Sequence, residues 1–203
     1  MITIIDYGMG NLGSIYNMFK RIKVDSEITG NIVKIEKAKK ILLPGVGSFD
    51  KAISIIDDLG LREILNKKAV IEKIPFLGVC LGMQLLTDFS EEGNLQGLCY
   101  ISAKTIKFKF SDNHYKIPHM GWNSVKLTGS NALIRDLPEE PRFYFVHSYY
   151  VKVEDKSNTL LKTMYGGIEF DSAIAKDNIY GVQFHPEKSH RYGMKLLENF
   201  ARI

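Results

Sequence analysis

The sequence predicts an α/β protein with a mostly parallel central sheet, helices on both faces and a strand-rich second half. In the first half, short apolar runs alternate with segments of helical character. Such alternation is typical of parallel strands joined by helices that cover both sides of one sheet. From Leu98 to Phe184, strand-like segments follow one another, and a helical segment ends the chain.

The positions of these runs define the expected elements. In the first half we predict strands at 2–6, 26–29, 41–43 and 74–79, and helices at 12–21, 52–56, 61–72 and 81–87. In the second half we predict strands at 104–110, 123–127, 142–146, 149–153, 160–164, 172–176 and 179–184, then a helix at 192–201. The sequence contains neither repeats nor a linker, so we expect one domain that spans residues 1–203.

The composition argues against several classes of protein. The 203 residues are 45% hydrophobic and 25% charged, and the net charge is only +4 with lysines spread along the chain, so nucleic-acid binding is not indicated. Two cysteines without metal-ligand spacing argue against a zinc site or a disulfide scaffold. We expect neither a metal nor a cofactor. No apolar run could span a membrane and no signal peptide is evident, which predicts a reduced, cytoplasmic setting.

Cys80 is the strongest candidate for a catalytic residue. It ends an apolar strand and precedes a helix in the run GVCLGMQ, where Gly78 and Gly82 flank it. This glycine pattern is typical of a tight strand-to-helix turn that presents a nucleophile. The free N–H groups of the helix N-terminus favour a thiolate and can bind an oxyanion. Gln84, about one turn later, is expected to face the same cleft. The alternative for Cys80 is a core cysteine, which is our interpretation of Cys99.

A base and a carboxylate that could orient it stand together in FHPEKS. His185 ends a predicted strand, Pro186 breaks that strand, and Glu187 follows. Side chains two residues apart lie on the same face of an extended segment. We therefore expect Glu187 to reach one imidazole nitrogen while the other faces Cys80, as nucleophilic catalysis requires. A surface turn is the alternative. The rival bases are His147, His190 and, in a loop-like stretch, His114 and His119.

Two glycine-rich loops follow predicted strands. The N–H groups of the loop 44–48 could bind phosphate or complete an oxyanion hole, and the presence of Cys80 favours the oxyanion hole. A plain turn between strand and helix is the alternative. The loop 8–13 matches the dinucleotide pattern GxGxxG, with Asp25 and Glu27 further on. A lone match is weak evidence, and these glycines equally suit a backbone that closely approaches another segment.

Three motifs together, PGVGSF, GVCLGMQ and FHPEKS, resemble those of the class I, triad-type glutamine amidotransferases. The resemblance runs from the first residues to the C-terminal helix and implies a flavodoxin-like fold that hydrolyses glutamine to glutamate and ammonia. It implies that Cys80 is the nucleophile, His185 the base and Glu187 the group that orients the base. The N–H groups of Leu81 and of Val46 or Gly47 look like the oxyanion hole. The side chains and backbone that look like substrate contacts belong to Gln84, Gly47, Ser148 and Tyr149.

The segments DYGMGNLGS and PHMGWN resemble those members of the family that supply ammonia to a separate cyclase of histidine biosynthesis. That resemblance implies a heterodimer with a (β/α)8 barrel, which typically needs ~250 residues and more βα units than this chain has. The implied docking residues are Asn11, Pro118, His119, Met120, Gly121, Trp122, Asn123 and Lys188. Trp122 is either an exposed anchor of this interface or a core residue.

Other functions are compatible with parts of the pattern. A relative that feeds a different barrel synthase would carry the same motifs. A cysteine hydrolase of related fold has no special need for an amide at Gln84. A non-catalytic binding module has no need for the intact set of Cys80, His185 and Glu187.

Overall fold

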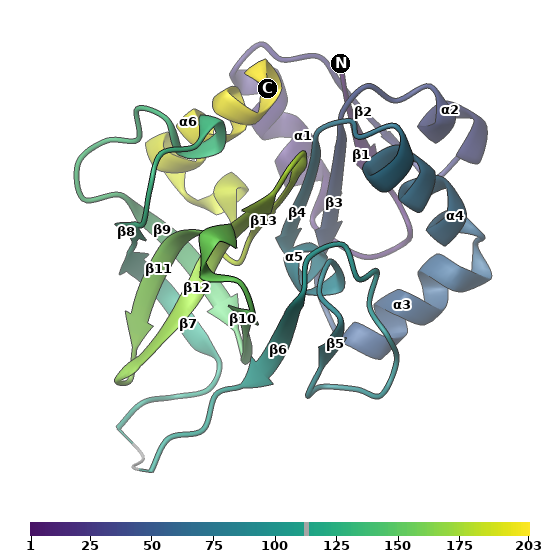
Figure 1. Ribbon diagram of the computed structural model, residues 1–203. Coiled ribbons are helices and arrows are strands. Elements are labelled where there is room, and N and C mark those ends of the chain that lie inside the picture. Colours follow the sequence, from purple (N-terminus) through teal and green to yellow (C-terminus); the bar gives the residue numbers. More distant parts are fainter. Residues whose placement is uncertain (112–113) are drawn as a thin grey trace.

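The computed structural model describes residues 1–111 and 114–203, and it contains a wide sheet with helices packed on both faces (Figure 1). Five strands run parallel in the order β2 (Ser26–Thr29), β1 (Ile2–Ile5), β3 (Ile41–Gly45), β4 (Phe76–Cys80) and β13 (Ile179–Val182). This parallel half confirms the fold class predicted from the first part of the sequence.

The strand-rich second half extends the sheet beyond β13. The order continues through β12 (Ile168–Lys176), β10 (Tyr149–Val153), β6 (Ala103–Lys107) and β5 (Phe89–Ser90), while β11 (Thr159–Tyr165) pairs with β12 and with β8 (Lys126–Leu127). These pairs are antiparallel except for β5 with β6. A separate two-stranded antiparallel sheet joins β7 (His119–Ser124) to β9 (Arg142–His147).

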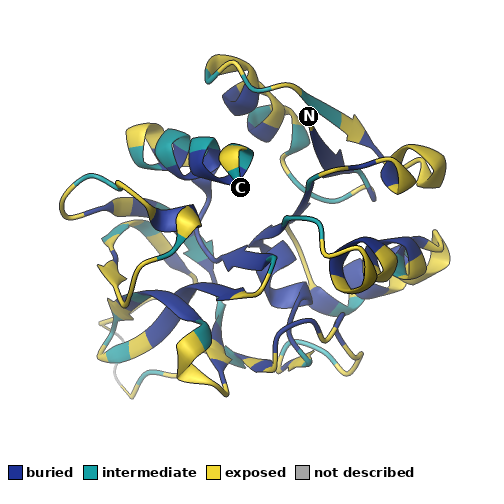
Figure 2. Cartoon of the chain, turned by 45° about the horizontal axis from the view of Figure 1, so that its top comes forward, coloured by how far each residue is buried: buried dark blue, intermediate teal, exposed yellow. Residues whose placement is uncertain are grey.

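Two apolar cores lie on opposite faces of the sheet because successive strand residues point to opposite sides. Leu43 on β3 packs in one core with residues of α2 (Ile32–Glu36), α3 (Phe49–Asp58), α4 (Leu61–Asn66) and α5 (Leu81–Leu85). Its neighbour Leu42 packs in the other with residues of α1 (Leu12–Arg21) and α6 (His190–Arg202). Figure 2 shows buried strands at the centre of the molecule and exposed surface on the outer sides of the helices.

The predicted elements are present, with exceptions where the local signal is short. The bounds of α1, β2 and β10 are those predicted. The predicted strand 123–127 is wrong as one element, because β7 ends at Ser124 and β8 begins at Lys126. The predicted helix 61–72 divides into α4 and a π-helical turn, Lys67–Ile71. Neither α2 nor β5 was predicted, since five and two residues are too few to establish a period.

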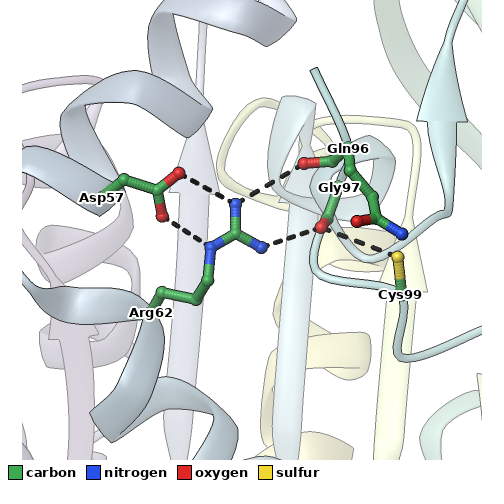
Figure 3. A network of polar contacts seen from close by, with 5 residues as sticks. All are labelled: Asp57, Arg62, Gln96, Gly97 and Cys99. Atoms are coloured by element: carbon green, nitrogen blue, oxygen red, sulfur yellow. Dashed lines mark hydrogen bonds and ion pairs between the residues drawn. The ribbon is translucent and has the colours of Figure 1, made fainter.

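Cys99 is exposed, so its interpretation as a core residue is wrong. Its Sγ lies 3.7 Å from the carbonyl oxygen of Gly97, in a turn where Cys99 itself has φ +57°. Arg62 holds this turn from outside: its guanidinium pairs with Asp57 and donates to the carbonyl oxygens of Gln96 and Gly97 (Figure 3). The turn is fixed through backbone carbonyls, so the sulfur need not be buried.

Within residues 1–111 and 114–203, every helix is too short or too polar to span a lipid bilayer. The same residues hold no group of three or more His, Cys, Asp and Glu side chains that could bind a metal ion.

Candidate active site

Cys80 occupies a strained turn between β4 and α5. Its φ of +57° and ψ of −112° are rare for a residue with a side chain. A Cβ at Gly82 would lie 1.9 Å from the carbonyl oxygen of Leu43, and a Cβ at Gly78 would lie 2.5 Å from that of Gly82. Neither contact is sterically allowed, so both flanking glycines are required for the turn. This confirms the tight turn that the sequence predicts.

The turn lies where the carboxyl ends of three parallel strands meet. Cys80 is in register with Gly45 of β3, and Val79 is in register with Val182 of β13. Sites in α/β sheets form at this edge. Two bonds then fix the segment after β13: the His185 N–H donates to the Tyr144 carbonyl oxygen at 2.9 Å, and the Ser189 hydroxyl donates to the His185 carbonyl oxygen at 2.6 Å.

His185 and Glu187 form a buried pair, with 2.8 Å between Nδ1 and Oε1. The predicted contact is therefore present, but the predicted geometry is wrong: Pro186–Lys188 is a 3-10 turn, and this turn brings the carboxylate back to the ring. Burial opposes the charged imidazole, yet contacts with Cys80 and Glu187 outweigh burial and raise the pKa of His185 to about 10.

The second nitrogen of His185 is available for chemistry. Among the residues that the structure describes, none hydrogen-bonds to His185 Nε2, although this atom is buried. His185 and Cys80 line the same pocket. A buried imidazole nitrogen without a partner, next to a thiol, is the arrangement that a proton transfer from sulfur needs.

Gln183 is a neighbour of Cys80 that sequence reasoning missed. Its side chain is fully buried, and its Nε2 donates to Cys80 Sγ at 3.9 Å while its Oε1 accepts from Gln84 Nε2 at 3.1 Å. In the sequence it is an ordinary polar residue within a strand, and no local pattern distinguishes it.

The structure excludes His147 and His119 as the base. They hydrogen-bond to one another at 2.9 Å, and His147 Nδ1 donates to the Tyr149 carbonyl oxygen at 2.6 Å. Burial lowers the pKa of His147 to about 3 and that of His119 to about 4, so both rings stay neutral. His119 belongs to β7, and its loop-like assignment is wrong. His190 stacks on Trp122, and His114 lies in the loop before β7.

One pocket of about 290 Å³ brings together most of the residues predicted for catalysis, the oxyanion hole and substrate binding. Its walls include eight of them: Val46, Gly47, Cys80, Leu81, Gln84, Ser148, Tyr149 and His185. Glu92 also lines the pocket, and its carboxylate accepts from the Phe49 N–H at 2.8 Å. Sequence reasoning missed Glu92, because only the fold brings it to the loop after β3.

The two glycine-rich loops lie against one another. A Cβ at Gly10 would contact the Pro44 ring at 3.2 Å, and the Met9 methyl group lies 2.8 Å from the place of a Cβ at Gly47. The close-approach interpretation of the loop 8–13 therefore explains Gly10 without a nucleotide.

Most of the predicted docking residues are at the surface. Met120 is 62% and Trp122 40% exposed, so the core alternative for Trp122 is wrong. Trp122 stacks on His190 with ring centroids 5.5 Å apart, and Lys188 Nζ lies over the ring of Tyr144. Asn11 and Pro118 are also exposed, and Gly121 and Asn123 are half-buried. His119, at 3% exposure, lies beneath this surface and cannot contact a partner there.

Comparison with known proteins identifies a family that this chain matches. The chain matches the family Glutamine amidotransferase class-I over residues 3–203. It is 62% identical over 202 residues to imidazole glycerol phosphate synthase subunit HisH 2 of Methanococcus maripaludis, an alignment that covers 100% of this chain and 99% of the relative. It is 44% identical to the HisH subunit of Leptospira borgpetersenii and 43% identical to HisH 2 of Pseudomonas aeruginosa, each over 100% of both chains.

Solved structures resemble the fold over the same length. The crystal structure of a glutamine amidotransferase superposes with a TM-score of 0.72 at 14% identity, covering 100% of this chain and 100% of the other. PurLQS of Thermotoga maritima gives a TM-score of 0.72 at 17% identity, covering 99% and 97%. At these identities the likeness concerns the fold alone. Because the family match and the relatives run the length of the chain, this protein belongs to the class I glutamine amidotransferase family.

Proposed function

We propose that this chain is the glutaminase subunit of an imidazole glycerol phosphate synthase, acting as one domain over residues 1–203. It hydrolyses L-glutamine and passes the ammonia to a cyclase partner with a (β/α)8 barrel, which forms imidazole glycerol phosphate in histidine biosynthesis. The observation that carries the chemistry is the buried His185–Glu187 pair, whose free ring nitrogen shares one pocket with Cys80. The names of the full-length relatives support the choice of synthase.

The first half of the reaction forms a thioester. His185 Nε2 holds the proton from Cys80, and the sulfur attacks the carbonyl carbon of the substrate's side-chain amide. The resulting oxyanion accepts hydrogen bonds from the Leu81 N–H and from the N–H of Val46 or Gly47. When the C–N bond breaks, His185 gives its proton to the nitrogen, and ammonia leaves.

The second half regenerates the thiol. Water attacks the glutamyl thioester while His185 Nε2 accepts a proton from it, and the C–S bond breaks to release glutamate. The proton on His185 then returns to Cys80. Glu187 accepts the Nδ1–H in every state, which keeps Nε2 directed at the reacting atoms and stabilises the charged ring.

The pocket walls suggest how glutamine is held. Both hydrogens of the Gln84 amide are already donated, to Tyr149 and Gln183, so its oxygen remains to accept a substrate N–H. Glu92 contributes negative charge at the pocket wall and suits the substrate's α-ammonium group. The backbone and side chains at Gly47, Ser148 and Tyr149 complete the proposed contacts.

We place the cyclase on the surface that carries Met120, Trp122 and Lys188, with Asn11, Pro118, Gly121 and Asn123 as further contacts. An exposed tryptophan stacked on another ring presents a large rigid area, which is typical of an interface anchor. Pro118 both adjoins this surface and lines the catalytic pocket, so ammonia released there forms next to the proposed interface. A cytoplasmic location suits a working thiol.

The test is glutamate release from glutamine, measured for the chain alone and with the cyclase and its nucleotide substrate. We expect strong stimulation by the cyclase, and we expect all turnover to vanish in Cys80→Ala. Cys80-dependent turnover that ignores the cyclase would retain the glutaminase chemistry and refute this choice of partner. Turnover that survives Cys80→Ala would refute the proposed nucleophile.

A further inference from the structure

The catalytic chemistry leaves a buried pair of histidines without a role. His147 on β9 lines the pocket and His119 on β7 lies behind it, in directly opposed positions of the small sheet. His119 is stacked between Tyr165 and Phe145, with ring centroids 4.0 and 4.8 Å away. His147 packs against Phe108 and Phe170. Because aromatic rings enclose these two polar imidazoles, any ring nitrogen left without a partner would be costly.

Hydrogen-bond partners determine the proton positions in this pair. The Tyr149 carbonyl can only accept, so His147 carries its proton on Nδ1. At the other end, Asn123 Oδ1 accepts from the Ser124 N–H, and Asn123 Nδ2 donates to the Met164 carbonyl oxygen. These two backbone groups fix the amide orientation, so Asn123 Nδ2 also faces His119 Nε2 as a donor.

The middle of the chain of hydrogen bonds follows from its two ends. His119 Nε2 accepts from Asn123, so His119 carries its proton on Nδ1 and donates it to His147 Nε2 at 2.9 Å. A further proton on either ring would set two donors against one another. The order of donation therefore has one direction: Asn123 to His119, His119 to His147, and His147 to Tyr149. The lowered pKa values of both rings agree with this neutral state.

The hydrogen bonds end at a carbonyl that belongs to the glutamine pocket. The Tyr149 oxygen accepts a second hydrogen bond, from Gln84 Nε2 at 3.2 Å. The same Gln84 nitrogen donates to Gln183, and Gln183 in turn donates to Cys80 Sγ. A shift of the Tyr149 carbonyl would therefore move the amide that lines the pocket and the donor that contacts the sulfur.

We propose that His119 and His147 are positioning residues, two neutral imidazoles with their protons ordered in one direction, which hold the Tyr149 carbonyl where it fixes Gln84 for substrate binding. The inference rests on the proposed glutaminase function for its substrate, but not for its proton order. Loss of the His119 donor would leave His147 Nε2 unpaired in an apolar enclosure. The His147 ring would then be held through Nδ1 alone, so the ring and the Tyr149 carbonyl that it contacts would lose their fixed position.

Two variants of His119 distinguish a positioning role of its hydrogen bond from a role in packing alone. In His119→Asn, the amide nitrogen can take the place of Nδ1 and donate to His147, whereas His119→Leu has similar size and no donor. We expect His119→Leu to weaken glutamine binding to the Cys80→Ala chain roughly tenfold, about the effect of one buried hydrogen bond, with binding largely restored in His119→Asn. In the chain with Cys80 intact, KM should rise more than kcat falls. His114→Asn, a histidine change in the loop before β7, is the control and should bind normally.

The proton order itself is read by nitrogen NMR of the imidazoles in the unmodified chain, which requires no variant to fold. We expect both His119 and His147 to show a bare Nε2 and a protonated Nδ1 at neutral pH. A proton on His147 Nε2, a charged ring, or equal binding loss in His119→Leu and His119→Asn would each overturn the proposal. If the Cys80→Ala chain binds no glutamine at all, the proposed function fails, and the NMR result alone then decides the proton order.

Discussion

At the scale of single residues, the reactivity of the site depends on which buried polar atoms lack a partner. His185 Nε2 is buried without a hydrogen-bond partner among the described residues, while His147, which lines the same pocket, has both nitrogens engaged. One imidazole can therefore accept a proton from sulfur, and the other cannot. The distinction comes from partners and not from residue type.

The first prediction concerns the carboxylate behind the base. In Glu187→Gln the amide would present a donor to Nδ1 and reverse the ring's tautomer, so kcat should fall by roughly a thousandfold or more while glutamine binding changes little. The pKa of His185 should also fall, because a neutral amide no longer stabilises the charged ring. Steady-state kinetics and an NMR titration of His185 measure both effects. Glu139→Gln, a change of surface carboxylate, is the control; equal activity in the two variants would contradict the role of Glu187.

Residue by residue, the sequence predicts the placement of Cys80, His185 and Glu187 well and that of their supporting residues poorly. Cys80 with its two glycines, and His185 with Glu187, are encoded in short motifs that need no knowledge of the fold. Gln183 and Glu92 act through residues about a hundred and about forty positions away, Cys80 and Phe49. Such contacts exist only once the strands have assembled. The wrong interpretation of Cys99 as a core residue has the same origin, because Arg62 of helix α4 holds the turn before Cys99 through a distant contact.

At the scale of elements, the nucleophile turn is set by steric exclusion between α5 and β3. The second prediction is that Gly82→Ala lowers the free energy of unfolding by about 3 kcal/mol, because its Cβ would meet the fixed carbonyl of Leu43 and neither element can move freely. Gly13→Ala in α1 is the matched control: no described atom lies within 4 Å of its Cβ, and alanine should stabilise the helix by roughly 0.5 kcal/mol. Urea denaturation measures both; similar destabilisation in the two would refute the steric argument.

The bounds of an element were predicted correctly where the element is long enough to show a hydrophobic period. Helix α1 has ten residues with one buried face, and its predicted bounds are correct. Helix α2 has only five, and the side chain of Asn31 caps it by accepting from the Val33 and Lys34 N–H groups. The predicted strand 123–127 fails because β7 pairs with β9 in the small sheet whereas β8 pairs with β11 in the large sheet, a change of partner that local alternation does not reveal. Short elements depend on tertiary contacts that a local pattern does not contain.

At the scale of the whole molecule, the fold places two kinds of surface next to one another. The parallel half places the proposed catalytic residues at the carboxyl edge of the sheet. The small sheet of β7 and β9 carries the exposed Met120 and Trp122 on the same strand as buried His119. Alternation along one strand thus puts the proposed docking face outside and the histidine pair inside. The class of fold was predictable from alternation of strand and helix, but the existence of the small sheet was not.

The neutral histidine pair has a consequence for global stability in acid. In the unfolded chain each imidazole takes up a proton near pH 6.5, whereas in the fold the pKa values of His119 and His147 are lowered to about 4 and 3. Between these values the unfolded state therefore binds more protons than the folded state. The contribution of the two histidines to the free energy of unfolding is fully present above pH 6.5 and is lost as the pH falls towards 4. Within this window, each histidine contributes up to about 1.4 kcal/mol per pH unit to the slope of the free energy of unfolding against pH.

The third prediction isolates one of these groups by difference. Urea unfolding is measured at pH values on the order of 6.0, 5.5 and 5.0, inside the window where the unfolded chain binds more protons. The slope of the free energy of unfolding against pH should be smaller in His119→Asn than in the unmodified chain, by the amount that corresponds to about one bound proton. Contributions from His185 and from the other titrating groups occur in both chains and cancel in the comparison. Because His119→Asn keeps a donor to His147, His147 stays neutral in the folded variant and still takes up a proton when the variant unfolds. Parallel slopes would mean that His119 is already protonated in the folded chain, which its hydrogen bonds to Asn123 and His147 do not permit.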